Sequence, residues 1–332
     1  MGWLIGVDVG GTFTDLIAQD EATGRTVLHK VPSTPEDPAE AIVAGLGQIA
    51  GRAGLAGPEI VRFAHGTTVA TNALIERKGG RMALVTTRGF RDLLEIGRQI
   101  RPRIYDLQAD QAAPLIPRER RLEVAERVGA DGAALAEPDA EAIDPVVEAI
   151  AADPEIEAVA VCFLFAFLNP AHERRVADAL RARRPDIFLS LSSEVQPEFR
   201  EYERLSTTVL NAFLQPRVTR YLERLGRAVA AEAPRARIGI NQSSGGLMSI
   251  DRAAAMPVRT ALSGPAAGVV GAAHIARLAG ERDVITLDMG GTSTDVCLIR
   301  DGGAAMTHQR DVAGFPIRMP AIDIHTVGAG GG

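Results

Sequence analysis

Short runs of alternating apolar and polar residues at the start of the 332-residue chain predict a group of strands. Residues 3–9, 13–19 and 25–31 are expected to form three strands joined by short turns. The next apolar residues recur at helical spacing, which predicts a helix from Pro38 to Ala53. The chain is therefore expected to open with three strands and a helix.

The remaining pattern alternates strands with helices. Further strands are expected at residues 60–64, 82–86, 158–165, 187–191, 237–241, 284–288, 295–300, 303–309 and 322–327. Further helices are expected within residues 65–75, at 171–184, from about 201 to 233 with a break near Pro216, and from Ser263 to about Ala279. Residues 97–140 are rich in Arg, Pro and Gly and are expected to be irregular. Antiparallel hairpins mixed with β-α-β units predict α/β layers.

One ten-residue pattern occurs twice, at residues 6–15 and 286–295. The shared positions are Asp8, Gly10, Gly11, Thr12, Thr14 and Asp15 in the first copy and Asp288, Gly290, Gly291, Thr292, Thr294 and Asp295 in the second. Each copy lies between two strand patterns, which predicts a β-hairpin with a two-residue turn whose glycines supply positive φ. A turn requires the glycines but not the repeated acids and threonines, so the duplication favours paired binding sites over ordinary turns.

Both hairpins carry groups that suit phosphate. Glycines let a ligand approach the backbone amides, and the threonine hydroxyls can donate to phosphate oxygens. Asp8 and Asp288 are expected at strand ends, where they could hold Mg²⁺ through water. Two such hairpins facing one another would clamp a nucleoside triphosphate from both sides.

Other polar groups leave alternatives open. Ser263 and Gly264 begin a helix, where unpaired amides favour an anion, although a plain N-cap explains them equally well. His65 could orient a substrate or move a proton, but a hydrogen-bonded structural histidine is the commoner case. Asp323 and His325 are two metal ligands on one expected strand face, and two ligands alone do not make a metal site.

A charged segment at residues 200–204 precedes hydroxyl residues 206–208. It could be an ordinary helix surface with paired charges, or it could line an interdomain cleft. There is no G-x-x-x-x-G-K-[ST] sequence, so the chain is not a P-loop protein. Only Lys30 and Lys78 are lysines, which leaves two candidates for a phosphate-binding lysine.

Composition narrows the class of protein. The length suggests about two domains. A net charge of −6 argues against a nucleic-acid-binding surface. Cys162 and Cys297 lie in apolar runs and are expected to be buried thiols in a reducing compartment. The longest apolar run, residues 158–168, is too short to span a membrane, and the chain starts directly in a strand, so a cytoplasmic protein without a membrane partner is expected.

Taken together, the motifs resemble the hydantoinase A / 5-oxoprolinase family, which includes ATP-dependent N-methylhydantoinases and related subunits of acetone and acetophenone carboxylases. The matching stretches are residues 6–15, 65–72, 87–92, 201–204, 206–211, 242–247, 263–268, 288–295 and 323–332. They follow one another along nearly the whole chain.

The resemblance implies an actin/Hsp70/sugar-kinase-like (ribonuclease H-like) ATPase core, with the two hairpins as its phosphate loops. Residues 1–200 would form a hydantoinase A N-terminal-like domain, and residues 201–332 would begin the ATPase domain. Family A subunits are longer than this chain. A strand running directly into the Gly-rich end at 328–332 also predicts that further protein follows, so the C-terminal portion is expected to be missing.

The resemblance also implies an enzyme: an ATP-dependent hydrolase that phosphorylates a cyclic amide such as a hydantoin, 5-oxoproline or another lactam. A hydantoinase B-type partner would then help water to open the ring. Asp8 and Asp288 would organise Mg²⁺, the threonines and Gly-Gly amides would hold phosphates, and Asp15 or Asp295 would steer the nucleophile. The alternatives are a carboxylase ATPase subunit, a kinase of the same superfamily, and an inactive nucleotide-binding fragment or scaffold subunit.

Overall fold

The computed structural model describes residues 2–34, 37–101, 103–106, 108–109, 111–290 and 294–328. The chain forms two compact units. Unit 1 comprises Met1–Asn72, Val218–His308 and Pro320–Gly332, and unit 2 comprises Ala73–Arg217 and Gln309–Met319. The sequence-based boundary at residue 200 stays a prediction.

Unit 1 contains a six-stranded sheet with the order β12-β11-β4-β1-β2-β3. Its strands are β1 (Trp3–Val9), β2 (Phe13–Asp20), β3 (Thr26–Pro32), β4 (Ile60–Gly66), β11 (Arg237–Asn241) and β12 (Leu247–Met248). β4 runs parallel to β1 and to β11, whereas the remaining neighbours are antiparallel. Asp8, Gly66 and Asn241 therefore lie at or next to the carboxyl ends of three adjacent parallel strands.

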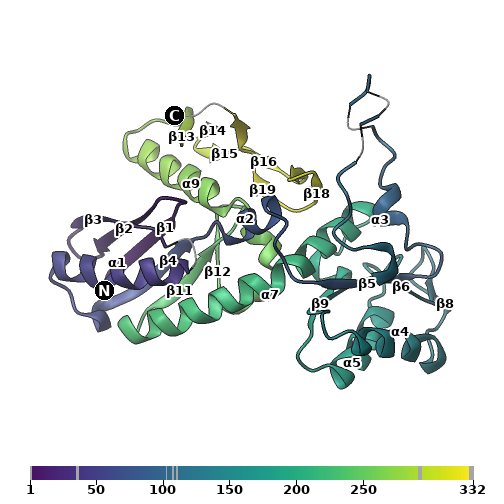
Figure 1. The fold of residues 1–332 in the computed structure, drawn as a ribbon. Helices are drawn as coiled ribbons and strands as arrows, with labels where there is room; N and C mark the ends of the chain where they lie inside the picture. The colour runs from purple at the N-terminus through teal and green to yellow at the C-terminus, as the bar shows by residue number, and fades with distance from the viewer. Residues whose placement is uncertain are drawn as a thin grey trace. The chain divides into compact units, whose positions relative to one another are not determined.

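Helix α1 (Pro38–Ala53) packs against β2 and β3 (Figure 1). The Asp37 side chain accepts a hydrogen bond from the Ala39 amide, and Pro38 occupies the first turn. Gly54 ends the helix with φ 70°, a left-handed conformation that glycine adopts without strain. The predicted bounds of this helix are confirmed, because its start, end and buried face are all local sequence signals.

A second sheet of unit 1 consists of β13 (Val284–Met289), β14 (Thr294–Arg300), β15 (Gly303–Ala304) and β20 (His325–Val327). Helix α9 (Ser263–Leu278) lies beside it (Figure 1) and contributes Ala266 and Val269 to a core with Cys297, Ile299 and Ile322. The single strand expected over 322–327 was wrong, because β19 (Ala321–Ile322) pairs with β16 (Met306–Thr307) and β20 pairs with β14. The chain changes partners between the two strands.

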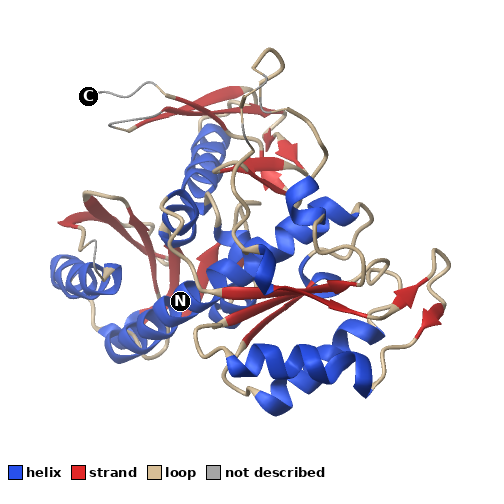
Figure 2. Cartoon of the chain, turned by 45° about the vertical axis from the view of Figure 1, so that its right-hand side comes forward, coloured by secondary structure: helices blue, strands red, loops and turns tan. Residues whose placement is uncertain are grey.

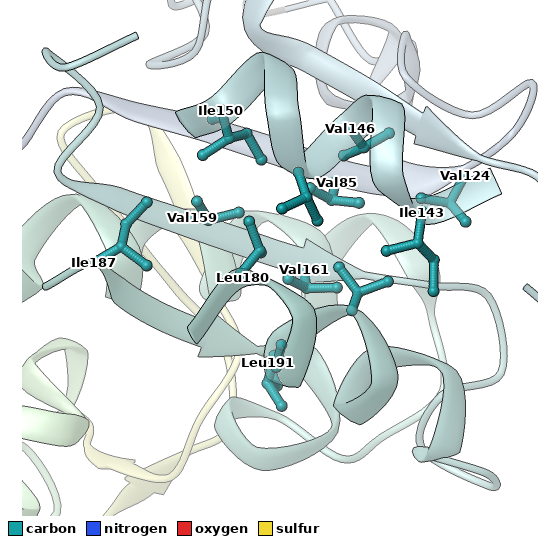
Figure 3. Close-up of a cluster of buried hydrophobic side chains, with 14 of the residues drawn as sticks. Val85, Val124, Ile143, Val146, Ile150, Val159, Val161, Leu180, Ile187 and Leu191 are labelled. Carbon is teal, nitrogen blue, oxygen red and sulfur yellow. The ribbon is translucent and has the colours of Figure 1, made fainter. Parts of the chain in front are cut away.

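Unit 2 is built on a parallel sheet with the order β10-β9-β5-β6. Its strands are β5 (Met82–Thr87), β6 (Arg121–Val124), β9 (Ala158–Cys162) and β10 (Phe188–Leu191). Helices α4 (Ala140–Ala152) and α5 (Ala171–Arg183) cover one face (Figure 2). Alternate strand residues such as Val85, Val159 and Val161 meet helix residues such as Ile150 and Leu180 in a single core (Figure 3).

The irregular excursion expected over residues 97–140 was only partly correct. β6 belongs to the central sheet of unit 2, and β7 (Arg127–Val128) pairs with β8 (Ala134–Ala136). A four-residue strand that begins with Arg121 carries too little apolar periodicity to be seen in the sequence. Its strand conformation comes from pairing with β5.

Helix α7 (Glu201–Glu232) runs without interruption through Pro216, so the break expected there was wrong. A proline in a helix costs about 3 kcal/mol. The burial of apolar side chains before and after Pro216 offsets this cost. These side chains are Leu210, Phe213, Leu214, Val218 and Leu222.

The shorter elements complete the chain. They are α2 (Val69–Ile75), α3 (Leu93–Ile96), α6 (Ser192–Val195), α8 (Ile250–Ala255), β17 (Arg310–Val312) and β18 (Phe315–Ile317), with 3-10 turns at Gly57–Glu59, Arg118–Arg120 and Pro257–Thr260. Cys162 and Cys297 are both buried and unbridged, as expected. Among the described residues, no helix has the length and apolar character needed to cross a membrane.

Candidate functional site

The first repeated motif forms the hairpin of β1 and β2. Asp8 pairs with Asp15 and Val9 pairs with Thr14 across the two strands. The Gly10 amide donates to the Phe13 carbonyl oxygen at 3.0 Å and closes a turn over Gly11 and Thr12. Neither Gly10 nor Gly11 has a left-handed φ, so the expected reason for these glycines was wrong. A Cβ at Gly11 would meet no atom within 4 Å, so this turn lies open.

The second repeated motif forms the hairpin of β13 and β14 in the same register. Asp288 pairs with Asp295 and Met289 pairs with Thr294. Gly290 follows β13 directly, while Gly291 and Thr292 lie outside the described residues. The duplication seen in the sequence is therefore also a duplication of strand pairing, with the acids at equivalent ladder positions.

A cavity of about 910 Å³ brings the two hairpins together within unit 1. The first hairpin contributes Asp8, Gly10 and Asp15 to its lining, and the second contributes Asp288. Lys30 of β3 also lines the cavity, and its Nζ lies 3.0 Å from Asp15 Oδ1. Of the two lysines considered from the sequence, Lys30 is the one that lines this cavity.

Negative charge accumulates around Asp8. Desolvation raises the pKa of its carboxyl above the usual value, and the nearby carboxylates of Asp15 and Asp288 raise that pKa further. Asp8 nevertheless remains accessible to solvent through the cavity. Asp295 differs, because its Oδ1 accepts a hydrogen bond of 2.6 Å from the Thr326 hydroxyl. The cavity therefore contains a carboxylate cluster with Lys30 as a cationic neighbour.

The carboxyl ends of the parallel strands converge closely on Asp8. A Cβ added to Gly66 would lie 2.9 Å from Asp8 Oδ1 and 3.4 Å from Asn241 Nδ2. A Cβ at Gly264, in the first turn of α9, would lie 3.6 Å from the same Asp8 oxygen. Gly66 and Asn241 were not identified from the sequence. Their position at the ends of parallel strands, where ligands bind in open α/β sheets, is the signal that could have found them.

Helix α9 begins at the cavity without a side-chain cap. Leu262 precedes the helix in a left-handed conformation with φ 62°. The Leu262 amide donates a hydrogen bond of 2.9 Å to Thr71 Oγ1, which holds this residue in place. The Ser263 hydroxyl is buried and donates to the Thr67 carbonyl oxygen, so the plain N-cap interpretation of Ser263 was wrong. Gly264 and Gly268 line the cavity, which places the positive end of the helix dipole there.

Ser33, just after β3, braces the first turn. Its hydroxyl donates to the Gly10 carbonyl oxygen at 2.8 Å, and its amide donates to the Thr12 carbonyl oxygen at 2.9 Å. The Thr14 side chain is buried and lies 3.0 Å from the Ser33 hydroxyl oxygen. Thr12 is exposed. The buried Thr14 side chain therefore supports the turn, whereas the exposed Thr12 hydroxyl is accessible to a ligand.

His65 of β4 is completely buried. Its Nε2 lies 2.6 Å from the Tyr221 hydroxyl, and its Nδ1 lies 3.3 Å from the Val7 carbonyl oxygen. Burial lowers the pKa of the imidazole to about 4. A neutral ring that donates from Nδ1 to Val7 and accepts from Tyr221 satisfies both contacts. This is the structural alternative for His65, and it fixes the backbone next to Asp8.

Asp323 and His325 do not share a strand. Asp323 lies between β19 and β20, and His325 begins β20. No group of three or more His, Cys, Asp or Glu side chains in the described parts of the chain is arranged to hold a metal ion.

Comparison with known proteins places this arrangement in a family. A family model described as the hydantoinase/oxoprolinase N-terminal region matches residues 4–183, and one described as hydantoinase/oxoprolinase matches residues 204–332. The chain belongs to the hydantoinase/oxoprolinase family. It is 38% identical to the caprolactamase subunit alpha of Pseudomonas jessenii over 99% of its own length and 48% of that protein. It is 36% identical to 5-oxoprolinase 1 of Arabidopsis thaliana over 98% of this chain and 28% of that one.

Two solved structures share this fold. The crystal structure of the ATP-dependent caprolactamase from Pseudomonas jessenii matches with a TM-score of 0.85 and 37% identity, over 99% of this chain and 48% of that one. A nucleotide-free acetone carboxylase structure matches with a TM-score of 0.88 and 26% identity, over 100% and 48%. The chain spans about half the length of these matched proteins, or less. The actin-like α/β fold expected from the sequence is confirmed.

Proposed function

We propose that this chain is the ATP-using part of an enzyme that phosphorylates a cyclic amide so that water can open the ring. The observation that carries the proposal is the pair of hairpins in identical register whose acids, Asp8 and Asp288, line one cavity. The names of relatives support the substrate class, since they include a caprolactamase subunit and 5-oxoprolinases.

In this proposal the triphosphate lies between the two turns. The Gly10 and Gly11 backbone, Thr12, and the first turn of α9 at Ser263 and Gly264 would face phosphate oxygens, since amides and a helix dipole favour anions. Thr14 would act through Ser33 by holding the turn. Asp15, paired with Lys30, would orient the attacking amide oxygen. Gly290, Gly291, Thr292, Thr294 and Asp295 are proposed as the equivalent second phosphate turn.

Mg²⁺ fits the donor set in one way. Desolvation raises the pKa of Asp8, the charges of Asp15 and Asp288 raise it further, and a divalent cation would relieve the repulsion between Asp8 and these two carboxylates. Mg²⁺ usually keeps several waters and takes one or two carboxylates together with phosphate oxygens, which does not require a three-ligand protein site. Asp8 and Asp288 would hold it through water. When bound, the ion would neutralise charge on the transferring phosphoryl group.

Phosphorylation of the amide oxygen would make the ring easier for water to attack. Amide resonance makes a lactam carbonyl a poor electrophile, and phosphorylation of its oxygen creates a leaving group. Here the chain's own residues would bind, align and neutralise charge, which is most of what phosphoryl transfer requires. A hydantoinase B-type partner would then help water to open the ring. The relative named as a caprolactamase subunit alpha supports a multi-subunit enzyme.

The test is ADP release by the native protein, purified with its bound partner and supplied with Mg-ATP and hydantoin, 5-oxoproline or simple lactams. We expect one class of ring to stimulate release, and we expect Asp8→Ala to lower stimulated release by ~10²-fold or more. Asp251→Asn, an exposed acid on α8 of unit 1, is the matched control and should leave release unchanged. Wild-type turnover by Asp8→Ala would refute the assignment of the site.

A second candidate is the ATPase part of a carboxylase that activates a ketone. The match to acetone carboxylase, with a TM-score of 0.88, favours it specifically. Stimulation of ADP release by acetone or acetophenone with bicarbonate, and by none of the rings, would select this alternative.

A further inference from the structure

Unit 2 contains a separate cavity of about 470 Å³ whose wall combines aromatic rings with arginines. Its lining includes Phe90, Phe165, Phe167 and Phe199 together with Arg200 and Arg204. Four phenylalanines and two leucines make most of this wall apolar. All of these residues belong to unit 2, so this cavity is separate from the nucleotide site proposed for unit 1.

Arg204 is the most unusual residue of this wall, because its side chain is only 1% exposed. Its Nη2 donates to the Phe163 carbonyl oxygen at 2.8 Å, and its Nη1 donates to the Ser192 hydroxyl. The Phe167 ring lies 5.7 Å from the guanidinium carbon. Its Nε has no hydrogen-bond partner among the described residues. A buried donor without an acceptor is rare, because its lost hydration is not replaced.

The charges around the cavity are only partly balanced. Arg98 forms hydrogen bonds with both carboxylate oxygens of Glu203. The positive charge of Arg204 is linked through Ser192 to a negative charge, because the Ser192 hydroxyl donates to the buried Glu173 carboxylate. Arg200 is exposed, lies 5.8 Å from the Phe199 ring, and has no carboxylate within 4.0 Å in the described parts of the chain. The Arg200 guanidinium is therefore available to an added anion, whereas the Arg204 Nε–H is unpaired but has almost no accessible surface.

Two lining residues have strained backbones. Phe165 has φ 56° and Arg200 has φ 76°, conformations that side chains other than glycine rarely adopt. Phe165 belongs to the turn that carries Phe163 and Phe167 past Arg204. Such strain persists where the surroundings enforce it, and it concentrates at ligand sites.

We propose that this cavity binds a small organic carboxylate with an apolar body. One carboxylate oxygen would accept from the Arg200 guanidinium, and the apolar body would pack among the phenylalanine rings. Movement of the Phe167 ring, which lies over the Arg204 guanidinium, would let the other oxygen accept from the Arg204 Nε–H. A phosphate monoester fits less well, because three anionic oxygens would meet one free Nε–H, one exposed guanidinium and the Glu201 carboxylate. The ligand would supply the acceptor that Arg204 lacks.

Calorimetric titration of the whole chain with phenylacetate and with phenylacetamide tests the proposal at constant ionic strength and without nucleotide. The two probes have nearly the same shape and differ in charge. We expect phenylacetate to bind and phenylacetamide to bind at least ~10-fold more weakly. Equal affinity for the two probes, or no binding of phenylacetate up to about 10 mM, would overturn the proposal.

Two variants locate the binding. Arg200→Gln changes an exposed side chain and should weaken phenylacetate binding at least ~10-fold. Arg204→Lys keeps the charge but removes Nε and should weaken it similarly, provided that circular dichroism shows a folded protein. Arg174→Gln on α5 is the matched control, an exposed arginine outside the cavity, and should bind like wild type. Unchanged binding by Arg200→Gln would refute this site even if Arg204→Lys fails to fold.

Discussion

At the residue scale, Asp8 is held in a position where its charge lowers the stability of the fold. Its pKa is raised by desolvation and by the charges of Asp15 and Asp288, so ionisation of this carboxyl opposes folding. A raised carboxyl pKa gives stability that is fully present below the unfolded-state value, and this stability is lost as the pH rises through the folded-state value. At pH 7 the ionised Asp8 carboxylate therefore lowers the free energy of unfolding.

Asp8→Asn should consequently raise the melting temperature at pH 7 while abolishing ATP turnover. The gain should be small, less than about 1 kcal/mol, because solvent in the cavity screens the repulsion. It should disappear below about pH 4, where the wild-type carboxyl is protonated in both states. Thermal melts of both proteins across this range check the prediction. A lower melting temperature at pH 7 would show that the Asp8 charge stabilises the fold.

His65 gives the opposite pH dependence. Its folded-state pKa, about 4, lies below the ordinary 6.5, so the unfolded chain binds the proton more readily. The stability from the neutral, buried ring is fully present above pH 6.5 and is lost as the pH falls from 6.5 toward 4. The loss amounts to roughly 3 kcal/mol at most.

We expect His65→Gln to flatten this part of the stability profile, because glutamine can accept from Tyr221 without titrating. Urea unfolding at pH 7 and pH 5 measures the effect. His274→Gln, at an exposed position of α9, is the control and should keep the wild-type slope. An unchanged slope in His65→Gln would mean that other groups cause the acid sensitivity.

At the scale of elements, two glycines show the difference between an effect of local helix propensity and an effect of tertiary contact. Gly47 lies on the exposed side of α1, and a Cβ there would meet nothing within 4 Å. Gly57 begins the 3-10 turn before β4, and a Cβ there would overlap the Glu232 carbonyl oxygen at the end of α7. A backbone atom in a helix end cannot move aside as a side chain can.

Gly47→Ala should raise the free energy of unfolding by ~0.5–1 kcal/mol, because alanine is the better helix former. Gly57→Ala should lower it by about 1–3 kcal/mol through steric strain. Chemical denaturation of the two variants makes a matched comparison. Stabilisation by both substitutions would show that the turn at Gly57 moves freely away from α7.

At the scale of the whole molecule, the two proposed sites lie in different units, so each ligand should protect its own segments. Hydrogen–deuterium exchange should slow in residues 6–15 and 263–268 when Mg-ATP is added. Phenylacetate should instead slow exchange in residues 163–168 and 198–204. Both effects follow from binding to the native state only. Loss of one effect while the other persists would separate failure of one proposal from failure of the other.

The sequence by itself determined the elements whose signals are local. The bounds of α1 follow from Asp37, Pro38 and Gly54, and the equal registers of the two hairpins follow from their repeated motif. The predictions failed where a segment's conformation depends on a partner distant in the sequence. Arg121–Val124 is a strand because it pairs with β5, and α7 continues through Pro216 because its residues are packed in the core.

Only the tertiary structure decided which groups meet. Asp8 and Asp288 are 280 positions apart in the sequence numbering, and their shared cavity depends on how two sheets of unit 1 are packed. The pKa of Asp8, the close approach of Gly66 and Asn241, and the unpartnered Nε of Arg204 all depend on distances across the fold. Local patterns fix the conformation of a segment, whereas electrostatics and steric contact depend on separation in space.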